Sequence, residues 1–204
     1  MGLLDEAVSE IASNRGLRLT WYAVILIFGV MAVLTVVFYN SLTSSYLGQS
    51  LLNETQHLRQ IASYVNVTPY LYPLLPVIIF AKNSLTDLLA YVFLVTVIIP
   101  IGIIAFNGGL VGFVTVFALP QHGNALVEFY LLAPHGVIEI PAFSLTVASI
   151  SLLRRGVGDM YVKGFALLLM SLLMLVIAAI FESSVTILAG SIISALTVHT
   201  AGAA

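Results

Sequence analysis

The chain has 204 residues, of which 60% are hydrophobic and 8% are charged, and its formal net charge is −2. Soluble domains carry roughly 25% charged residues, so this composition excludes a soluble globular protein. The slightly acidic balance offers no basic patch for nucleic acid, and the lack of cysteine excludes disulfides and thiolate-bound metals. Long apolar runs predict an all-α, polytopic transmembrane helix bundle of about six spans, with one short or re-entrant segment.

Residues 1–19 are predicted to form an amphipathic N-terminal surface helix, followed by a transmembrane bundle over residues 20–204. Apolar side chains recur at helical spacing over residues 3–12, and three carboxylates lie on the other side. A helix with this pattern lies on a membrane surface or packs against a partner. Residues 20–38 are the first predicted span, because interfacial aromatic residues begin an uninterrupted apolar run there.

Residues 39–72 are the largest polar stretch and predict an exterior loop that contains a short amphipathic helix. Asn53 and Asn66 begin sequons in this loop, so both are candidate glycosylation sites in a host that glycosylates. The apolar segment 70–81 is rich in proline and too short to cross a bilayer. It predicts an interfacial or re-entrant segment that ends at Lys82.

The second predicted span begins near Asp87 and ends near Pro100. Asn107-Gly108-Gly109 is expected to turn the chain into a shorter apolar run, and Glu182-Ser183-Ser184 is expected to interrupt the last long run. The spans predicted after the exterior loop cover residues 85–105, 110–119, 125–153, 161–181 and 185–198.

Positive charge near the span ends predicts the orientation, because cytoplasmic loops are enriched in lysine and arginine. Arg59 and Lys82 fall on one side of the predicted bundle. The basic residues on the other side are Arg15, Arg18, Arg154, Arg155 and Lys163. We therefore expect a multi-pass protein of the cell membrane with both termini in the cytoplasm and residues 39–72 outside.

The stretch 133–142 reads APHGVIEIPA and places two ionisable residues in a segment apolar enough for a bilayer. His135 and Glu139 are four residues apart, so they project from the same face of a helix. Pro134 and Pro141 bracket them and are expected to shape that helix, because each removes a backbone donor. Ionisable groups at membrane depth usually face the interior of a bundle, which makes this stretch the leading candidate site.

Asn107 and Glu182 also lie at the predicted membrane depth and could converge with His135 and Glu139 on one buried polar cluster. Three interpretations stay open for this cluster: a hydrogen-bond network that fixes the bundle, a proton or ion relay, and a divalent metal site. The network is favoured, because the sequence offers one polar cluster and no continuous polar pathway.

Small residues predict where helices approach closely, either within the chain or across a dimer. The expected packing glycines are Gly108, Gly109, Gly112 and Gly136. They do not form a phosphate loop, because no lysine or strand accompanies them, and the membrane-depth serines have no paired base. We expect a homodimer with no catalytic activity and no cofactor.

Four strings between residues 80 and 186 together resemble the stage II sporulation protein M family of integral membrane proteins. They are Lys82-Asn83, residues 107–112, residues 134–142 and residues 178–182, and the range over which they are spread is about half of the chain. The family often shows two asparagines where this chain has Asn83 followed by Ser84.

The resemblance implies a membrane scaffold or a subunit of a multiprotein assembly, with other membrane or exterior proteins as partners. In spore formers, family members resemble membrane partners of a complex that includes a cell-wall hydrolase. The alternatives are a small transporter or channel, which would use the buried histidine and glutamate, and an intramembrane metal-dependent enzyme.

Overall fold

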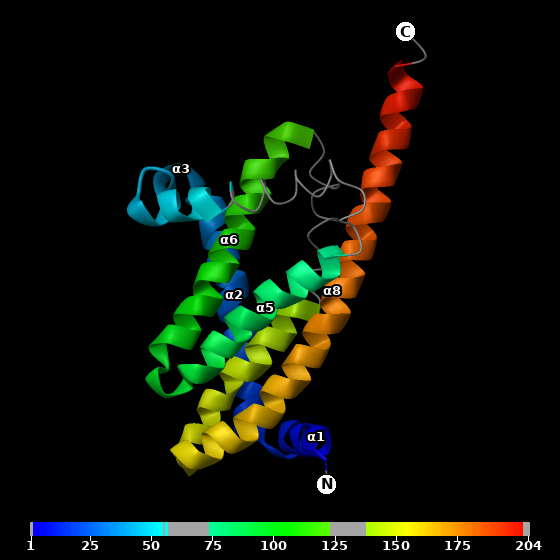
Figure 1. Ribbon diagram of the computed structural model, residues 1–204. Coiled ribbons are helices and arrows are strands. Elements are labelled where there is room, and N and C mark those ends of the chain that lie inside the picture. Colours follow the sequence, from blue (N-terminus) through cyan, green and yellow to red (C-terminus); the bar gives the residue numbers. More distant parts are fainter. Residues whose placement is uncertain (1, 55, 57–73, 123–137, 202–204) are drawn as a thin grey trace.

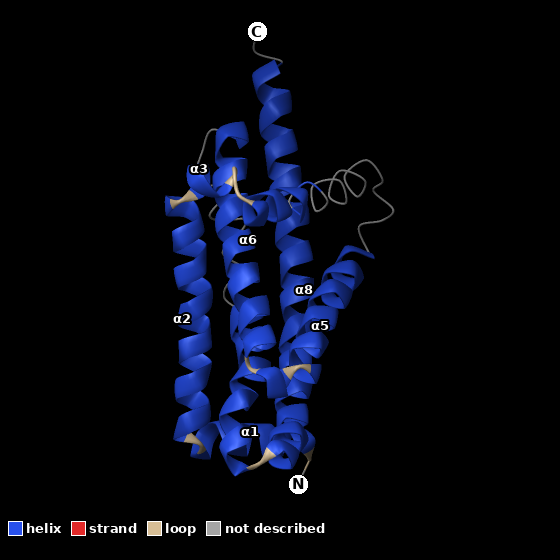
Figure 2. Cartoon of the chain, turned by 90° about the vertical axis from the view of Figure 1, so that its left-hand side faces the viewer, coloured by secondary structure: helices blue, strands red, loops and turns tan. Residues whose placement is uncertain are grey.

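The computed structural model describes residues 2–54, 56, 74–122 and 138–201, and the secondary structure of this part is entirely helical (Figures 1 and 2). The all-α prediction is therefore confirmed. Long helices run side by side to form a bundle, and the shortest described elements lie near its two ends (Figure 2).

Helix α1 (Leu3–Ser13) lies across one end of the bundle, which we call the base (Figure 2). Asn14 separates it from α2 (Arg15–Val37), and the Asn14 side chain caps α2 by accepting a hydrogen bond from the Leu17 amide at 3.2 Å. The amphipathic helix and the first span thus form as separate elements, with the span beginning a few residues earlier than predicted.

The polar stretch after α2 contains helical structure at the opposite end of the bundle, as the sequence predicted. Helix α3 (Tyr39–Leu42) is followed by helical residues 46–54 (cyan in Figure 1). The candidate glycosylation residue Asn53 is exposed there, whereas Asn66 lies outside the described residues. Gly48 packs close against the carbonyl of Leu42, so this segment folds back on itself.

The second predicted span, residues 85–105, is wrong, because the chain reverses in its middle. Helix α5 (Leu75–Val92) passes through Lys82 without a break, contrary to the expected short segment ending there. A 3-10 turn, η2 (Leu94–Thr96), and Val97 with a φ of 57° then lead into α6 (Ile98–His122). A positive φ is rare for a β-branched residue, and Pro100 is tolerated because it falls in the first turn of α6.

Asn107-Gly108-Gly109 does not turn the chain but lies inside α6, which packs along α2. A Cβ atom on Gly108 would lie 2.4 Å from the Phe28 carbonyl oxygen. A Cβ atom on Gly112 would lie 2.2 Å from the Ala32 carbonyl oxygen. These glycines therefore allow two helices of the same chain to touch through their backbones.

The last third of the chain forms a helical hairpin. Residues 138–148 are helical and continue into the 3-10 helix η3 (Ser149–Arg155), and Gly156, with a φ of 121°, reverses the chain into α8 (Val157–Ala201). The predicted interruption at residues 182–184 is wrong. The hydroxyls of Ser183 and Ser184 both donate to the Ile180 carbonyl of their own helix, so these polar groups are satisfied without a break.

Three of the described helices are long and apolar enough to cross a membrane: Arg15–Val37, Ile98–Val116 and Val157–Ser184. The expected number of about six spans is therefore not confirmed. The N-terminal helix α1 and the C-terminal end of α8 lie at opposite ends of the bundle in both views (Figures 1 and 2). The expectation that both termini face the same side does not fit this arrangement.

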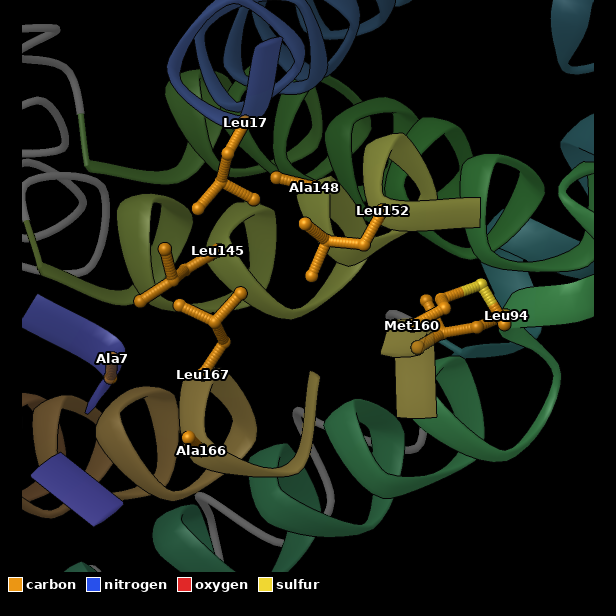
Figure 3. Packing of buried hydrophobic residues seen from close by; sticks show 9 residues of the cluster. All are labelled: Ala7, Leu17, Leu94, Leu145, Ala148, Leu152, Met160, Ala166 and Leu167. Carbon is orange, nitrogen blue, oxygen red and sulfur yellow. The ribbon is translucent and has the colours of Figure 1, made fainter. Parts of the chain in front are cut away.

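Residues 138–148 form the central helix of the bundle, since every residue from 142 to 149 is buried. One apolar cluster joins this helix to α2, α5, α6 and α8 through Phe28, Ala90, Ile104, Val147 and Leu175. A second cluster lies closer to the base, where Leu17, Leu145 and Leu167 converge (Figure 3). A helix that is buried all round is held by its neighbours and not by lipid.

Candidate functional site

A buried carboxyl group lies in the interior of the bundle, on the inner face of α5. Asp87 has no exposed surface, and neither of its carboxylate oxygens has a hydrogen-bond partner among the described residues. An ionised carboxylate in such a place is costly unless it is paired or coordinates a cation. Asp87 is therefore the residue of the described chain that most requires a functional explanation.

Hydroxyl groups from two other helices surround this carboxyl group. Thr146 of the central helix and Ser171 of α8 are fully buried, and their hydroxyls are the polar groups that act on the Asp87 carboxylate. Neither hydroxyl reaches it with the geometry of an ordinary hydrogen bond. The buried hydroxyls of Ser144 and Ser149 on the same central segment also have no hydrogen-bond partner among the described residues.

A pair of tyrosines fixes α5 against α8 one helical turn closer to the base. The Tyr91 hydroxyl donates to the Tyr161 carbonyl at 2.8 Å, and the Tyr161 hydroxyl donates to the Val92 carbonyl at 2.9 Å. Gly164 brings the backbone of α8 close to Ser149, because a Cβ atom there would lie 3.2 Å from the Ser149 Cβ. Asp87 lies four residues before Tyr91 and therefore on the same face of α5. Ser171 lies seven residues after Gly164 and therefore on the same face of α8.

A second polar site ties α1 to the base of the bundle, and we call it the Glu10 hub. The Glu10 carboxylate accepts a hydrogen bond from Asn14 Nδ2 at 2.8 Å. It also forms ion pairs with Arg155 Nη1 at 2.6 Å and with Lys163 Nζ at 3.3 Å. Arg18 adds a contact by donating to the Ile11 carbonyl at 2.9 Å, near the end of α1.

The electrostatics of the hub favour the charged form of Glu10. Burial alone would raise the pKa of this carboxyl group, since Glu10 is only 8% exposed. The hydrogen bonds from Asn14 and Lys163, together with the positive charges of Lys163 and Arg155, outweigh burial and hold the pKa below its usual range. The hub thus joins α1 to the turn between η3 and α8, which lies about 145 residues further along the chain.

The cationic side chains of the hub are already used by Glu10, and Lys82 lies 3.6 Å from Glu54 near the other end of the bundle. Among the residues that the structure describes, no lysine, arginine or histidine forms an ion pair with Asp87. The two polar sites are therefore of different kinds: one is a largely buried carboxylate paired with two cationic side chains, and the other is a carboxyl group without a counter-charge.

The predicted cluster of Asn107, His135, Glu139 and Glu182 is only partly visible. Asn107 Nδ2 donates to the Ile103 carbonyl of its own helix at 2.8 Å. Glu139 and Glu182 are partly buried and both have interaction partners. His135 lies outside the described residues, so the convergence of these four residues stays a prediction.

Of the remaining candidate residues, some belong to the described part of the chain and others do not. Pro141 lies in the first turns of the central helix, and its carbonyl accepts a hydrogen bond from Trp21 Nε1 at 2.8 Å. Pro134 and Gly136 fall outside the described residues. Gly109 faces Thr35 of α2, with a Cβ contact of 3.3 Å, and so lies at the same interface as Gly108 and Gly112.

Metal coordination by acidic and histidine side chains was one interpretation of the predicted cluster. In the ranges that the structure describes, no group of three or more His, Cys, Asp or Glu residues is close enough to hold a metal ion. The Asp87 site has different chemistry, because hydroxyl oxygens accompany its single carboxylate.

Sequence reasoning gave Asp87 no role beyond the start of a span, and it treated the serines only as possible nucleophiles. A signal was present in the spacing of Ser84, Asp87 and Tyr91, which places three polar groups on one face of an otherwise apolar helix. Glu10 was assigned to the polar face of α1. Its ion-pair partners lie more than a hundred positions away in the sequence. The periodicity of side chains within α1 therefore does not predict them.

The apolar helices, the central buried helix and the basic residues near the base define a helical integral membrane protein. The family model described as Stage II sporulation protein M matches residues 22–187, and the chain belongs to that family. The match extends well beyond the four strings that first indicated it. Neither the comparison with curated proteins nor that with solved structures finds a significant match.

Proposed function

We propose that the protein is an integral scaffold in the cell membrane, a subunit that holds other proteins of a larger assembly in place. The observation that carries this proposal is the rigid internal attachment of the bundle. The Glu10 hub fixes α1 to η3 and α8 at the base, while backbone contacts at Gly108 and Gly112 fix α6 to α2.

These contacts favour a scaffold over a transporter for a mechanical reason. Alternating access requires groups of helices to rock or slide against one another. Helices that touch through their backbones slide only if the close contact is first broken, and a buried ionic contact opposes the release of α1. A body that keeps its shape suits a subunit whose role is to position partners.

The basic residues near the base support an orientation. Arg15 begins α2, Arg18 contacts the end of α1, and Arg155 and Lys163 both pair with Glu10 of α1. The enrichment of such residues in cytoplasmic segments supports a cytoplasmic base and an exterior end formed by α3 and residues 46–54. The C-terminal end of α8 then also lies on the exterior side.

The exterior end is the surface that we assign to the partner. Tyr46 is 91% exposed there, beside the exposed side chain of Leu47. Aromatic side chains supply much of the contact energy in protein interfaces. A membrane or exterior protein is the expected partner, and for relatives in spore formers this would be the complex with a cell-wall hydrolase.

Purification from native membranes in a mild detergent tests the scaffold. The wild-type chain should retain a partner in fixed stoichiometry, and Tyr46→Ala should reduce the retained amount several-fold. Val162→Ala is the matched control, because Val162 is also a highly exposed apolar residue but lies on α8 near the base. A wild-type chain that retains no stoichiometric partner would contradict the proposal.

We also propose that the scaffold is a homodimer, the commonest closed form of a small assembly. The glycines that first motivated a dimer, Gly108, Gly109 and Gly112, face α2 of the same chain. The interface must therefore use another surface, such as the exposed apolar side chains of α2 or α8. Mass measurement in lipid nanodiscs should give twice the mass of one chain, and a monomer at every concentration would refute the dimer.

A further inference from the structure

We propose that Asp87, together with Thr146 and Ser171, binds a dehydrated monovalent cation of the size of Na⁺ in the interior of the bundle. The proposal rests on the burial of these three side chains, on their origin in three different helices and on the absence of other partners for their oxygens in the described residues. It does not depend on the proposed scaffold function.

The charge of the ligand follows from the charge of the site. One carboxylate contributes one negative charge, and the hydroxyl groups around it are neutral. A monovalent cation leaves the bundle interior neutral, whereas a divalent cation would leave one uncompensated positive charge in a medium of low dielectric. A lysine or arginine would serve the same purpose, but the described cationic side chains lie elsewhere.

The ligand atoms determine the chemical class of the cation. The site offers oxygen only, from one carboxylate and at least two hydroxyls, and oxygen ligands suit hard cations without redox chemistry. A hydroxyl whose oxygen coordinates a cation can still donate its proton to a nearby acceptor.

The close packing around the site favours a small ion. Near the base side of the site, Gly164 lies so close to Ser149 that an added Cβ atom would be 3.2 Å from the Ser149 Cβ. The tyrosine pair fixes the separation of α5 and α8 in the same layer. A fixed and narrow separation holds Na⁺ more readily than the larger K⁺.

Thermal unfolding of the purified chain in nanodiscs tests the proposal, with NaCl exchanged for choline chloride at constant ionic strength. A cation that binds only the folded state raises the midpoint of unfolding in a saturable manner. We expect such a rise with Na⁺ and a smaller one with K⁺. Radioactive Na⁺ should bind with a stoichiometry of one ion per chain.

The variants separate this site from a general effect of salt. Asp87→Asn should abolish both the rise in the unfolding midpoint and the binding of Na⁺, whereas Asp159→Asn, at an exposed position of α8, should leave both unchanged. If Asp87→Asn does not fold, Ser171→Ala and Thr146→Val should shift the Na⁺ dependence to about tenfold higher concentration, as expected for the loss of one charge-assisted contact.

Three results would contradict the proposal. Equal midpoints in NaCl and choline chloride would show that Asp87 is kept as a neutral acid and holds no cation. A Na⁺ effect that persists in Asp87→Asn, or in both hydroxyl variants at unchanged concentration, would show that the ion binds elsewhere. An equal response to K⁺ would refute the assignment of a small ion.

Discussion

The contact between α2 and α6 allows a sharp prediction for Gly112→Ala. The added methyl group would lie 2.2 Å from the Ala32 carbonyl oxygen, where an ordinary contact is at least 3.4 Å. Because the obstacle is backbone, α6 must move away from α2 by about 1 Å and lose packing along the interface. Overpacking of this kind costs about 1–3 kcal/mol, and the better helix propensity of alanine offsets about 0.5–1 kcal/mol of it.

Unfolding of purified variants in detergent, followed by circular dichroism, measures this cost. For a chain of this length each 1 kcal/mol lowers the midpoint by about 2–4 °C, so Gly112→Ala should unfold several degrees below the wild type. Gly102→Ala is the matched control on the same helix, because its added Cβ would meet no atom within 4 Å. It should be as stable as the wild type or slightly more stable.

Gly108→Ala should resemble Gly112→Ala, since its Cβ would lie 2.4 Å from the Phe28 carbonyl oxygen one turn away. The double variant should be less destabilised than the sum of the two single variants, because one displacement of α6 relieves both clashes. If Gly112→Ala were as stable as Gly102→Ala, the backbone contact between α2 and α6 would not exist as described.

Three further predictions concern other parts of the chain. The pKa of Glu10 is lower in the folded state, so the hub should stabilise the wild type at neutral pH and lose that contribution as pH falls through the folded pKa. Glu10→Gln should lack this pH dependence, and its free energy of unfolding at pH 7 should be lower than that of the wild type by about 1 kcal/mol. Cysteines at Ser44 and Gly156 should be labelled from opposite sides of the membrane, and labelling of both from one side would refute the proposed orientation. If Glu139 belongs to a structural network, Glu139→Ala should lower thermal stability clearly and Glu139→Gln only slightly, whereas loss of function by Glu139→Gln with stability intact would indicate metal or proton traffic.

The sequence predicted those elements whose signal is local. Helix α1 follows from amphipathic spacing, and α2 follows from a long apolar run with an interfacial aromatic at its start. The break at Gly156 follows from a cluster of arginine and glycine. In each case, neighbouring residues alone determine the element.

The errors arose where the same local signal has two structural meanings. An asparagine–glycine pair marks a turn in a soluble chain, but at Asn107-Gly108 it permits close helix packing, and which meaning applies depends on the presence of α2. The reversal at Val97 has no glycine, and only the packing of α5 and α6 against other helices explains it. The polar residues at 183–184 bond to their own helix, which hydropathy alone does not register.

The candidate site was harder to predict for the same reason. Asp87, Thr146 and Ser171 are unremarkable separately, and they become a site only because three helices bring them together. The histidine and glutamate of residues 133–142 could be predicted as a pair because they lie four positions apart in one segment. Proximity in sequence is visible in advance, whereas proximity across helices requires knowledge of the packing.

The position of the central helix in the sequence also affects how it can be inserted into the membrane during synthesis. Its neighbours α2, α5 and α6 are made before it, but α8, which covers its remaining side, is made after it. When the ribosome has just finished residues 138–148, Thr146 and its neighbouring hydroxyls have no α8 to face. Truncation of the chain before Val157 should therefore leave this segment outside the bilayer or bound by the insertion machinery, and the last helix would be the element that completes insertion of the one before it.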